Sequence, residues 1–372
     1  MTIIILQPAM PMYRRALFEL MAKEVGSGFF VYASFEGNLG ALEVDRAGIE
    51  WLRSLEPLKS IIPGLEWQPG ALSIPLSRGD TLVVSGAPRT VSTLVLIAKA
   101  KLLGVRVVWW GHYWSSTSKS WRASIRLGLM RLADSVVFYT DQEVDEYSRR
   151  YSVREAKPVI GLNNGLDAAA IDRYRTTYSS VSRQRDLIFI GRLVPKANLE
   201  LLLQAMVLPA CAHMHLDIVG DGPSRTALAE LSVGLGVDSR VRWHGALVEE
   251  SEIAKVANKC KAFVFPGNVG LSLIHGLSYG LPVVVHDNRW EHAPEIAALQ
   301  VGVNGSTFRQ GDAPSLAHVL ASTLSDGAKL DAYSSAATET IRGSFNTVDM
   351  SRRFLSVLLN TGPGGAGVGR GE

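Results

Sequence analysis

The sequence predicts an α/β protein built from two doubly wound, Rossmann-like units in tandem. Its 372 residues are too many for one ordinary hydrophobic core and suit two domains. Short apolar, β-branched runs alternate with amphipathic stretches of helical spacing, which is typical of a parallel sheet covered by helices on both faces. The alternation pauses in the polar segment 168–186 and then restarts. Because ligands bind at the carboxyl ends of such strands, two tandem units predict a central cleft.

The composition is that of a globular protein and argues against several classes of function. Hydrophobic residues make up 47% and charged residues 20% of the chain, and the net charge of +3 is too small to indicate a nucleic-acid partner. Cys211 and Cys260 match no metal spacing, and the start MTIIILQPAM lacks the basic region of a signal peptide. No apolar run approaches the ~18 residues of a membrane span. We therefore expect a cytoplasmic protein with reduced thiols.

The first unit comprises residues 1–165. Its predicted strands are 2–6, 29–33, 80–86, 105–111, 135–139 and 157–163, and its predicted helices are 13–24, 89–103, 119–133 and 141–150. Residues 37–79 are rich in Gly and Pro, and their pattern assigns no element.

The second unit comprises residues 166–360 and is followed by a Gly-rich tail, 361–372, that we expect to be disordered. Its predicted strands are 186–191, 214–220, 241–245, 261–266 and 281–287, and its predicted helices are 198–207, 223–235, 249–258 and 271–279. A last helix near 348–359 is expected to return to the first domain.

Three glycine motifs of the second unit follow predicted strands. In FIGRLVPKANLELLLQA, Gly191 allows a tight turn and Arg192 offers a fork of donors for phosphate oxygens, although a solvated Arg in a turn is an equal alternative. DIVGDGP contains Gly222 but lacks the full Gly-x-Gly-x-x-Gly fingerprint of a dinucleotide-binding fold, which argues against a dehydrogenase. In PGNVGLSLIHGLSYGLPVVV, a glycine loop precedes a helix, and the free N–H groups at the start of that helix suit a diphosphate. The alternative is a strand-to-helix turn with only a structural role.

In this order the motifs resemble the donor domain of retaining GT-B glycosyltransferases of family 4. The resemblance is clearest from about 186 to 311, through GRLVPKANLELLLQA, IVGDGP, VFPGNVGLSLIHGLSYGLPVVVHDN and PEI, and looser in the first half through YRRALF, WGH and NNGLD. It implies that residues 1–165 are an acceptor-binding domain and residues 166–360 a donor-binding domain. It also implies a nucleotide-diphosphate sugar as co-substrate, no resident cofactor, and deprotonation of the acceptor hydroxyl by the donor phosphate itself. The donor-binding residues predicted on this basis are Gly191, Arg192, Lys196, Gly222, Gly267, Asn268, Val269, Gly270, Leu271, His275 and Glu295.

The chain departs from the family at the residues that usually carry charge. The family's Glu-x7-Glu motif aligns with Gly267 and His275, so both acids are absent. The usual phosphate-binding Lys aligns with Ala197, and Lys196 is its neighbour. A neutral His275 can still hydrogen-bond a ribose hydroxyl, whereas Gly267 cannot contact a sugar through a side chain. Donor recognition is therefore expected to differ from the family pattern.

The first unit supplies the other predicted site residues. His112 follows a strand where family members carry a His that faces the donor sugar, and we assign it and Arg192 as catalytic, in positioning and charge stabilisation; the alternative for His112 is a strand-end cap. The predicted acceptor-binding residues are Tyr13, Arg14, Gly86 and Arg89. No metal is expected, because no Asp-x-Asp lies in a suitable loop and basic groups can offset the diphosphate.

A basic, partly apolar stretch at 119–135 raises the question of membrane contact. Lys119, Arg122, Arg126 and Arg131 could face anionic lipid, but we favour an ordinary surface helix packed on the sheet. A peripheral position at the inner face of the membrane would suit a lipid-linked acceptor.

The sequence thus predicts a retaining glycosyltransferase that moves a sugar from a nucleotide-diphosphate sugar to a hydroxyl of a glycan or lipid-linked acceptor, in polysaccharide biosynthesis. The competing hypothesis is a non-catalytic GT-B subunit that binds sugar nucleotides or a partner protein. Its support is the loss of charge at Gly267, His275 and Ala197. A dehydrogenase is a third and more distant alternative.

Overall fold

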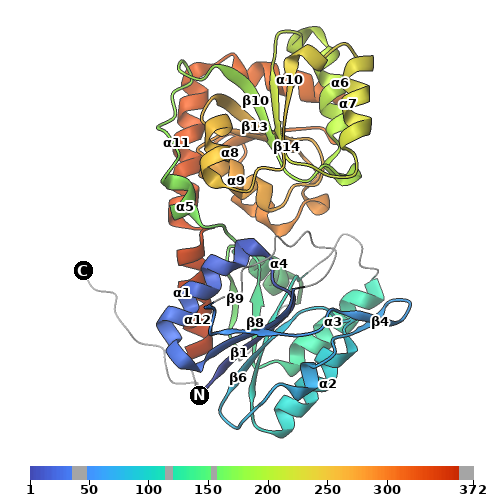
Figure 1. Ribbon diagram of the computed structural model, residues 1–372, viewed down its shortest axis with the longest axis vertical. Coiled ribbons are helices and arrows are strands. Elements are labelled where there is room, and N and C mark those ends of the chain that lie inside the picture. The colour runs from blue at the N-terminus through green and yellow to red at the C-terminus, as the bar shows by residue number, and fades with distance from the viewer. Residues whose placement is uncertain (36–47, 114–119, 152–156, 360–372) are drawn as a thin grey trace, which may run out of the picture. The chain divides into compact units, whose positions relative to one another are not determined.

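The computed structural model describes residues 1–35, 48–113, 120–151 and 157–359, and the chain divides into two compact units (Figure 1). The N-terminal unit comprises Met1–Leu162 and Val348–Glu372, and the C-terminal unit comprises Asn163–Thr347. The chain therefore crosses between the units twice, and the predicted boundary at 165 falls near the first crossing. The predicted tail, 361–372, lies outside the described residues.

A seven-stranded parallel sheet forms the centre of the N-terminal unit, with the strand order β3-β2-β1-β6-β7-β8-β9. Its strands are β1 (Ile3–Ala9), β2 (Phe29–Ser34), β3 (Leu52–Ser54), β6 (Thr81–Ser85), β7 (Arg106–Trp110), β8 (Ser135–Phe138) and β9 (Val159–Gly161). A separate antiparallel hairpin joins β4 (Lys59–Ile62) to β5 (Leu65–Trp67).

Helices cover both faces of this sheet. They are α1 (Arg15–Val25), α2 (Val91–Leu102), α3 (Ser120–Leu132), α4 (Asp141–Tyr151) and α12 (Thr347–Leu359). Successive residues of β1 point to opposite faces, as the period of a strand requires. Ile3 and Ile5 join the core that α1 and α12 cover, whereas Ile4 and Leu6 join the core that α2, α3 and α4 cover. The strand is therefore apolar at every one of these positions.

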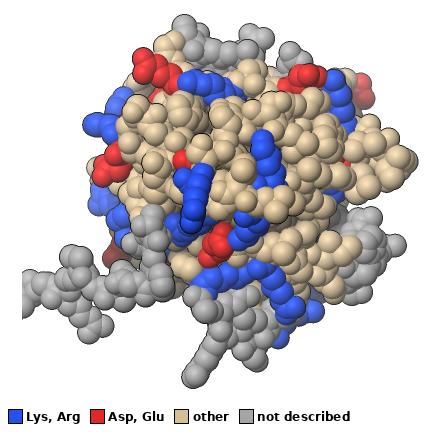
Figure 2. Space-filling view, turned by 90° about the horizontal axis from the view of Figure 1, so that it is seen from below, with Lys and Arg blue, Asp and Glu red and all other residues tan. Residues whose placement is uncertain are grey.

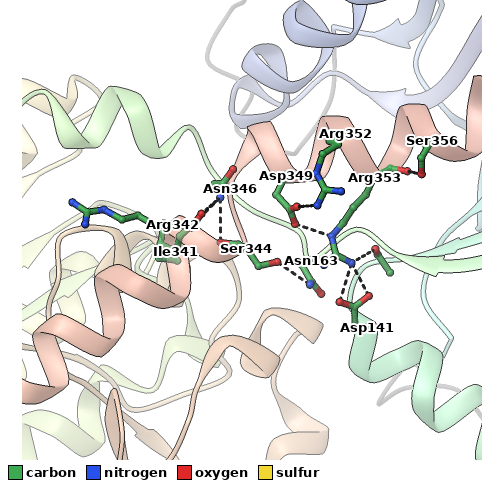
Figure 3. A network of polar contacts seen from close by, with 11 residues as sticks. Asp141, Asn163, Ile341, Arg342, Ser344, Asn346, Asp349, Arg352, Arg353 and Ser356 are labelled. Carbon is green, nitrogen blue, oxygen red and sulfur yellow. Dashed lines mark hydrogen bonds and ion pairs between the residues drawn. The ribbon is translucent and has the colours of Figure 1, made fainter. Parts of the chain in front are cut away.

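The last helix, α12, belongs to the N-terminal unit although it follows the C-terminal unit in the chain. Its apolar side packs into the first core through residues such as Phe354. Its polar anchor is Arg353, which donates from Nη1 to both carboxylate oxygens of Asp141 at 2.9 Å and to the Gly161 carbonyl at 3.2 Å, and from Nε to Asp349 at 2.7 Å (Figure 3). These partners join α12 to the first residue of α4 and the end of β9.

The C-terminal unit has a six-stranded parallel sheet with the order β12-β11-β10-β13-β14-β15. Its strands are β10 (Arg185–Ile190), β11 (Leu216–Val219), β12 (Val241–Gly245), β13 (Cys260–Phe265), β14 (Val283–His286) and β15 (Gly305–Phe308). Its helices are α5 (Ala168–Asp172), α6 (Leu199–Val207), α7 (Arg225–Gly234), α8 (Glu250–Ala257), α9 (Leu271–Ser278), α10 (Ala313–Leu324) and α11 (Gly327–Gly343). Because β10 lies between β11 and β13, the loops that follow these three strands are neighbours.

Short 3-10 helices connect many of these elements. They are η1 (Met12–Arg14), η2 (Gly26–Gly28), η3 (Ala71–Ser73), η4 (Pro195–Ala197), η5 (Pro209–Cys211), η6 (Asp238–Arg240), η7 (Arg289–Glu291) and η8 (Pro294–Ala298).

The structure confirms the predicted α/β class and the order of strands and helices, and it adds elements in three places. The unassigned segment holds β3 and the β4–β5 hairpin within its described residues. Every residue of β4 is exposed, so β4 has no buried face that would produce an alternation of apolar and polar residues in the sequence. The polar segment 168–186 begins with α5, and the chain after 287 continues through β15, α10 and α11.

Candidate functional site

The three glycine motifs of the C-terminal unit meet at one edge of its sheet. The loop after β10 is hydrogen-bonded to the loop after β11, since Leu193 N–H donates to the Asp221 carbonyl at 2.9 Å. It is also bonded to the loop after β13, since Asn268 N–H donates to the Lys196 carbonyl at 3.0 Å. The three strands are direct neighbours in a parallel sheet, so their carboxyl ends lie together although the motifs are far apart along the chain.

Glycine is required where these loops touch. A Cβ atom on Gly220 would stand 1.9 Å from the Gly191 carbonyl oxygen, and one on Gly222 would stand 2.4 Å from the Leu193 carbonyl oxygen. Both glycines also have positive φ angles, +144° and +158°, that other residues rarely adopt. Gly222 therefore shapes the site through its backbone, because only a residue without a side chain permits this approach.

The loop after β13 ends at the N-terminus of α9. Gly270 is the N-cap residue, and its carbonyl accepts the Leu273 N–H at 2.9 Å. The N–H groups of the first turn, beginning with Leu271, have no carbonyl of an earlier helical turn to bond, and the helix dipole adds a partial positive charge there. This end of α9 has the electrostatics of an anion site.

Two cations lie on the loop that contacts this region. Arg192 and Lys196 are both exposed, and within the described part of the chain neither side chain has a hydrogen-bond or ion-pair partner. Ala197, where the family carries its Lys, is 1% exposed and packs into the core. The exposed ammonium group of this turn is therefore that of Lys196.

Gly267, where the family carries its first acid, lies against the same turn. Its Cβ position is 2.1 Å from the carbonyl oxygen of Lys196 and 2.6 Å from the carbonyl carbon of Ala197. No side chain fits there unless the backbone of η4 moves. The packing of the loop therefore favours a glycine at position 267.

His275, where the family carries its second acid, is paired with a carboxylate from another helix. Its Nε2 lies 3.2 Å from Oε2 of Glu250, which also accepts a hydrogen bond from the Tyr279 hydroxyl at 2.7 Å. Burial by itself would raise the pKa of Glu250, but the hydrogen bonds from His275 and Tyr279 outweigh it, and the net shift of this pKa is downward. The side chains of His275 and Glu250 are 14% and 27% exposed.

The sequence analysis did not identify Glu250. It begins α8, and 25 residues separate it from His275, so only the packing of α8 beside α9 brings the two together. An acidic residue in the first turn of a helix is ordinary, and the sequence offered no other signal.

Glu295 lies next to the glycine loop in η8. It is 5% exposed, and its Oε2 stands 3.8 Å from the position that a Cβ on Gly270 would take. Its Oε1 accepts a hydrogen bond from the Asn164 amide, which is also buried. Asn164 belongs to the NNGLD stretch of the sequence, so this contact joins two stretches on which the resemblance was based.

His112 follows β7 in the N-terminal unit and is held against a neighbouring strand end. Its ring lies against that of Tyr139 in a tilted arrangement, with a centroid distance of 4.3 Å, and Nδ1 lies 3.8 Å from the carboxylate of Glu143. Glu143 is buried and accepts hydrogen bonds from the backbone N–H groups of Tyr113 and Tyr139, each at 3.0 Å. The side chain of His112 remains 46% exposed, so its ring can still meet a ligand.

The predicted acceptor residues differ in exposure. Tyr13 is 40% exposed, but Arg14 is 5% exposed and its guanidinium lies 4.1 Å from the centre of the Trp110 ring. Gly86 packs against Gly111, with only 2.7 Å between its Cβ position and the Cα of Gly111. Arg89 is exposed and forms an ion pair with Glu66 at 3.1 Å. Tyr13 and Arg89 thus have accessible side chains, whereas Arg14 and Gly86 contribute to packing.

The basic helix α3 packs on the sheet, as we favoured. Arg126 is 8% exposed and donates to the Tyr113 carbonyl at 3.3 Å, and burial lowers its pKa. Arg131 is exposed, whereas Lys119 and the side chain of Arg122 lie outside the described residues. The face in Figure 2 carries Lys and Arg side chains interspersed with Asp and Glu side chains among uncharged surface. The buried Arg126 does not contribute to a basic outer face.

Two further properties bear on the chemistry. Within the described residues, no helix is long and apolar enough to cross a membrane. Within the same residues, no cluster of three or more His, Cys, Asp or Glu side chains is arranged to hold a metal ion.

Comparison with known proteins identifies the class of the C-terminal unit. Residues 184–326 match the family described as "Glycosyl transferases group 1". These residues contain all three glycine motifs and the Glu250–His275 pair. This stretch of the C-terminal unit is therefore similar to a glycosyl transferases group 1 domain.

Relatives and solved structures extend the comparison to the rest of the chain. The lipopolysaccharide core biosynthesis glycosyltransferase LpsE of Rhizobium meliloti (strain 1021) is 23% identical over 239 residues, which cover 63% of this chain and 67% of LpsE. The structure of Alr3699/HepE of Anabaena in complex with UDP has a TM-score of 0.71 at 18% identity, over 97% of this chain and 100% of that one. A glycosyltransferase from Rickettsia africae ESF-5 also gives 0.71, at 14% identity, over 97% and 99%. This likeness confirms the predicted GT-B fold of two Rossmann-like domains.

Proposed function

We propose that this protein is a retaining glycosyltransferase, similar to family 4, that uses a nucleotide-diphosphate sugar as donor. The observation that carries the proposal is the meeting of Arg192, Lys196 and the N-terminus of α9 at one edge of the C-terminal sheet. Two exposed cations, neither with a partner among the described residues, and a helix N-terminus offer three favourable partners to a diphosphate. The group 1 domain and the UDP bound in the HepE structure support this assignment and make UDP the first nucleotide to test.

Each donor-site residue has a chemical role in this proposal. The Gly270 and Leu271 amides bind oxygens of the diphosphate, and the guanidinium of Arg192 neutralises the charge that grows on it as the glycosidic bond breaks. Glu250 accepts a hydrogen bond from a ribose hydroxyl, or orients His275 so that the imidazole binds that hydroxyl, in place of the acid that the family carries at 275. The acceptor hydroxyl loses its proton to the donor phosphate, so no protein carboxylate is required as base.

The N-terminal unit provides the acceptor side in this proposal. His112, held by Tyr139 and near Glu143, orients the donor sugar, while the exposed Tyr13 and Arg89 contact the acceptor. The acceptor is a glycan or a lipid-linked glycan of a bacterial polysaccharide pathway, which the name of LpsE supports. A lipid-linked acceptor would bring this cytoplasmic protein to the membrane surface.

The experiment that tests the donor site measures thermal stabilisation of the protein by UDP, GDP, ADP and their common sugar conjugates, with NAD as control. A ligand that prefers the folded state raises the melting temperature, by an amount that grows with its concentration above Kd. We expect one nucleoside diphosphate to give this shift. We expect Arg192→Ala to weaken its binding by about 1.5–3 kcal/mol, the range for a charged hydrogen bond. Arg173→Ala, at an exposed Arg after α5, is the matched control and should bind as wild type.

Sugar transfer distinguishes an enzyme from the competing non-catalytic subunit. The loop packing at Gly267 favours the subunit hypothesis, because no donor-sugar acid can be present there. Binding of a sugar nucleotide without hydrolysis or transfer to any acceptor glycan would support that alternative. Transfer with retained anomeric configuration, lost in Arg192→Ala, would support the enzyme. If no nucleotide shifts the melting temperature, the proposed donor site is refuted.

A further inference from the structure

Two buried histidines lie behind the glycine loop and have no role in the proposed chemistry. His286 is the last residue of β14 and His292 follows η7; they are 1% and 3% exposed. Their rings are stacked, with centroids 3.8 Å apart and an angle of 18° between the planes. Both contact residues that precede Gly270, so they lie where the direction of the loop is set.

His292 binds the backbone of Val269. The Val269 N–H donates to Nδ1 of His292 at 3.1 Å, and Nε2 lies 2.9 Å from the His286 carbonyl oxygen. An amide N–H can only donate and a carbonyl can only accept, so Nδ1 carries no proton and Nε2–H is the donor. The next residue, Ala293, donates its own N–H to the Val269 carbonyl at 2.9 Å. Residues 292–293 therefore hold both polar groups of the Val269 backbone.

His286 binds the side chain of the preceding loop residue. Its Nε2 lies 3.3 Å from Oδ1 of Asn268, whose amide nitrogen donates to Glu291 at 3.3 Å. Nδ1 of His286 is buried and has no hydrogen-bond partner among the described residues. A proton on that atom would have no acceptor, so His286 also fits its surroundings only as a neutral imidazole.

The charges around the pair are consistent with neutral rings. Burial is the largest effect on each ring and lowers its pKa. The ring of His292 also lowers the pKa of His286, and with all effects together that pKa is about 4. Asp287 and Glu291 face the pair and act in the opposite direction, as does the hydrogen bond of His292 to the His286 carbonyl. Burial outweighs these opposing effects.

We infer that His286 and His292 are positioning residues, which as neutral imidazoles fix Asn268 and Val269 and thereby aim the Gly270 and Leu271 amides. The inference rests on the proposed function for what those amides bind. The two rings do not touch the donor. They act by holding the loop in its binding conformation in the free protein, so that binding need not order it.

The test compares His292→Ala with His292→Asn and with His318→Ala. In His292→Asn, the δ-oxygen takes the place of Nδ1, so the acceptor for Val269 is kept in a side chain that does not titrate. His318 lies exposed on α10 and is the matched control. The first readout is hydrogen exchange of the Val269 amide in the ligand-free protein. We expect His292→Ala to speed this exchange by about 5- to 150-fold, because leaving a buried donor without its acceptor costs about 1–3 kcal/mol. We expect His292→Asn and His318→Ala to exchange as wild type.

The second readout is the affinity of the same proteins for UDP. We expect about tenfold weaker binding by His292→Ala, and recovery in His292→Asn. Unchanged Val269 exchange in His292→Ala, or exchange in His292→Asn faster than in wild type, would overturn the inference. The second of these outcomes needs no folded His292→Ala protein. Failure of wild type to bind any nucleoside diphosphate would refute the proposed function instead, while the exchange data would still decide whether His292 holds the loop.

Discussion

Replacing Gly267 by Ala tests whether the packing of the donor loop excludes a side chain. The new Cβ would stand 2.1 Å from the Lys196 carbonyl oxygen, whereas nonbonded atoms are optimally about 3.5–4.0 Å apart. The backbone of η4 would have to move by about 1.4 Å to reach the lower of these distances, and this strains the hydrogen bond from the Asn268 N–H to the same oxygen, now 3.0 Å. Overpacking costs about 1–3 kcal/mol and a lost hydrogen bond about 1 kcal/mol more. We expect Gly267→Ala to lower the free energy of unfolding by about 2–4 kcal/mol.

Urea unfolding followed by circular dichroism measures this change. The matched control is Gly234→Ala at the end of α7, where a Cβ meets nothing within 4 Å and Ala favours the helix. That variant should be as stable as wild type or more so. A Gly267→Ala protein within about 0.5 kcal/mol of wild type would show that the loop adapts freely, and the packing argument for the missing acid would then be wrong.

Three more predictions address other contacts. Glu250→Ala leaves the Tyr279 hydroxyl without its carboxylate, and we expect a loss of about 1–3 kcal/mol in the free energy of unfolding, with weaker nucleotide binding by calorimetry. Arg353→Ala removes hydrogen bonds to two carboxylates and a carbonyl, and should lower the free energy of unfolding in urea by about 2–3 kcal/mol. The control Arg352→Ala, at a 72% exposed side chain, should cost under about 1 kcal/mol. Equal losses in the two variants would refute the role of Arg353 as the polar anchor of α12. Because His286 has its pKa lowered from 6.5 to about 4, the unfolded chain takes up its proton first as pH falls, so stability should drop by up to about 3 kcal/mol between these values. His286→Gln should show a smaller drop over the same pH range, and an unchanged pH profile would argue that His286 is not neutral in the fold.

Much of the fold could be read from the order of patterns along the chain. Continuous apolar strands such as β13 and β14, each followed by a turn and a helix or loop, are buried on both faces and leave a signal in hydrophobicity alone. The β4–β5 hairpin left no such signal, because β4 is fully exposed and lies outside both sheets. Elements whose stability depends on contacts with distant segments are not visible in a local pattern.

The candidate site was predictable only in its backbone part. Gly191, Gly222 and the 267–271 loop stand directly after strands, and neighbouring parallel strands bring such loops together. Their sequence thus identified the edge of the sheet where an anion would bind. The exposed Arg192 was also identifiable, since its position in a strand-to-helix turn keeps it in solvent.

The sequence by itself determined the succession of strands and helices, the tandem α/β units and the residue types of the glycine loops, because these follow from local periodicity and from the conformational freedom of glycine. Only the tertiary structure decided which side chains meet. It paired Glu250 with His275, placed the carbonyl of Lys196 where a side chain at Gly267 would stand, and stacked His286 on His292. The physical reason is that periodicity reports which face of an element is buried, whereas the partner of a side chain depends on strand order and helix packing, which join residues far apart in the chain.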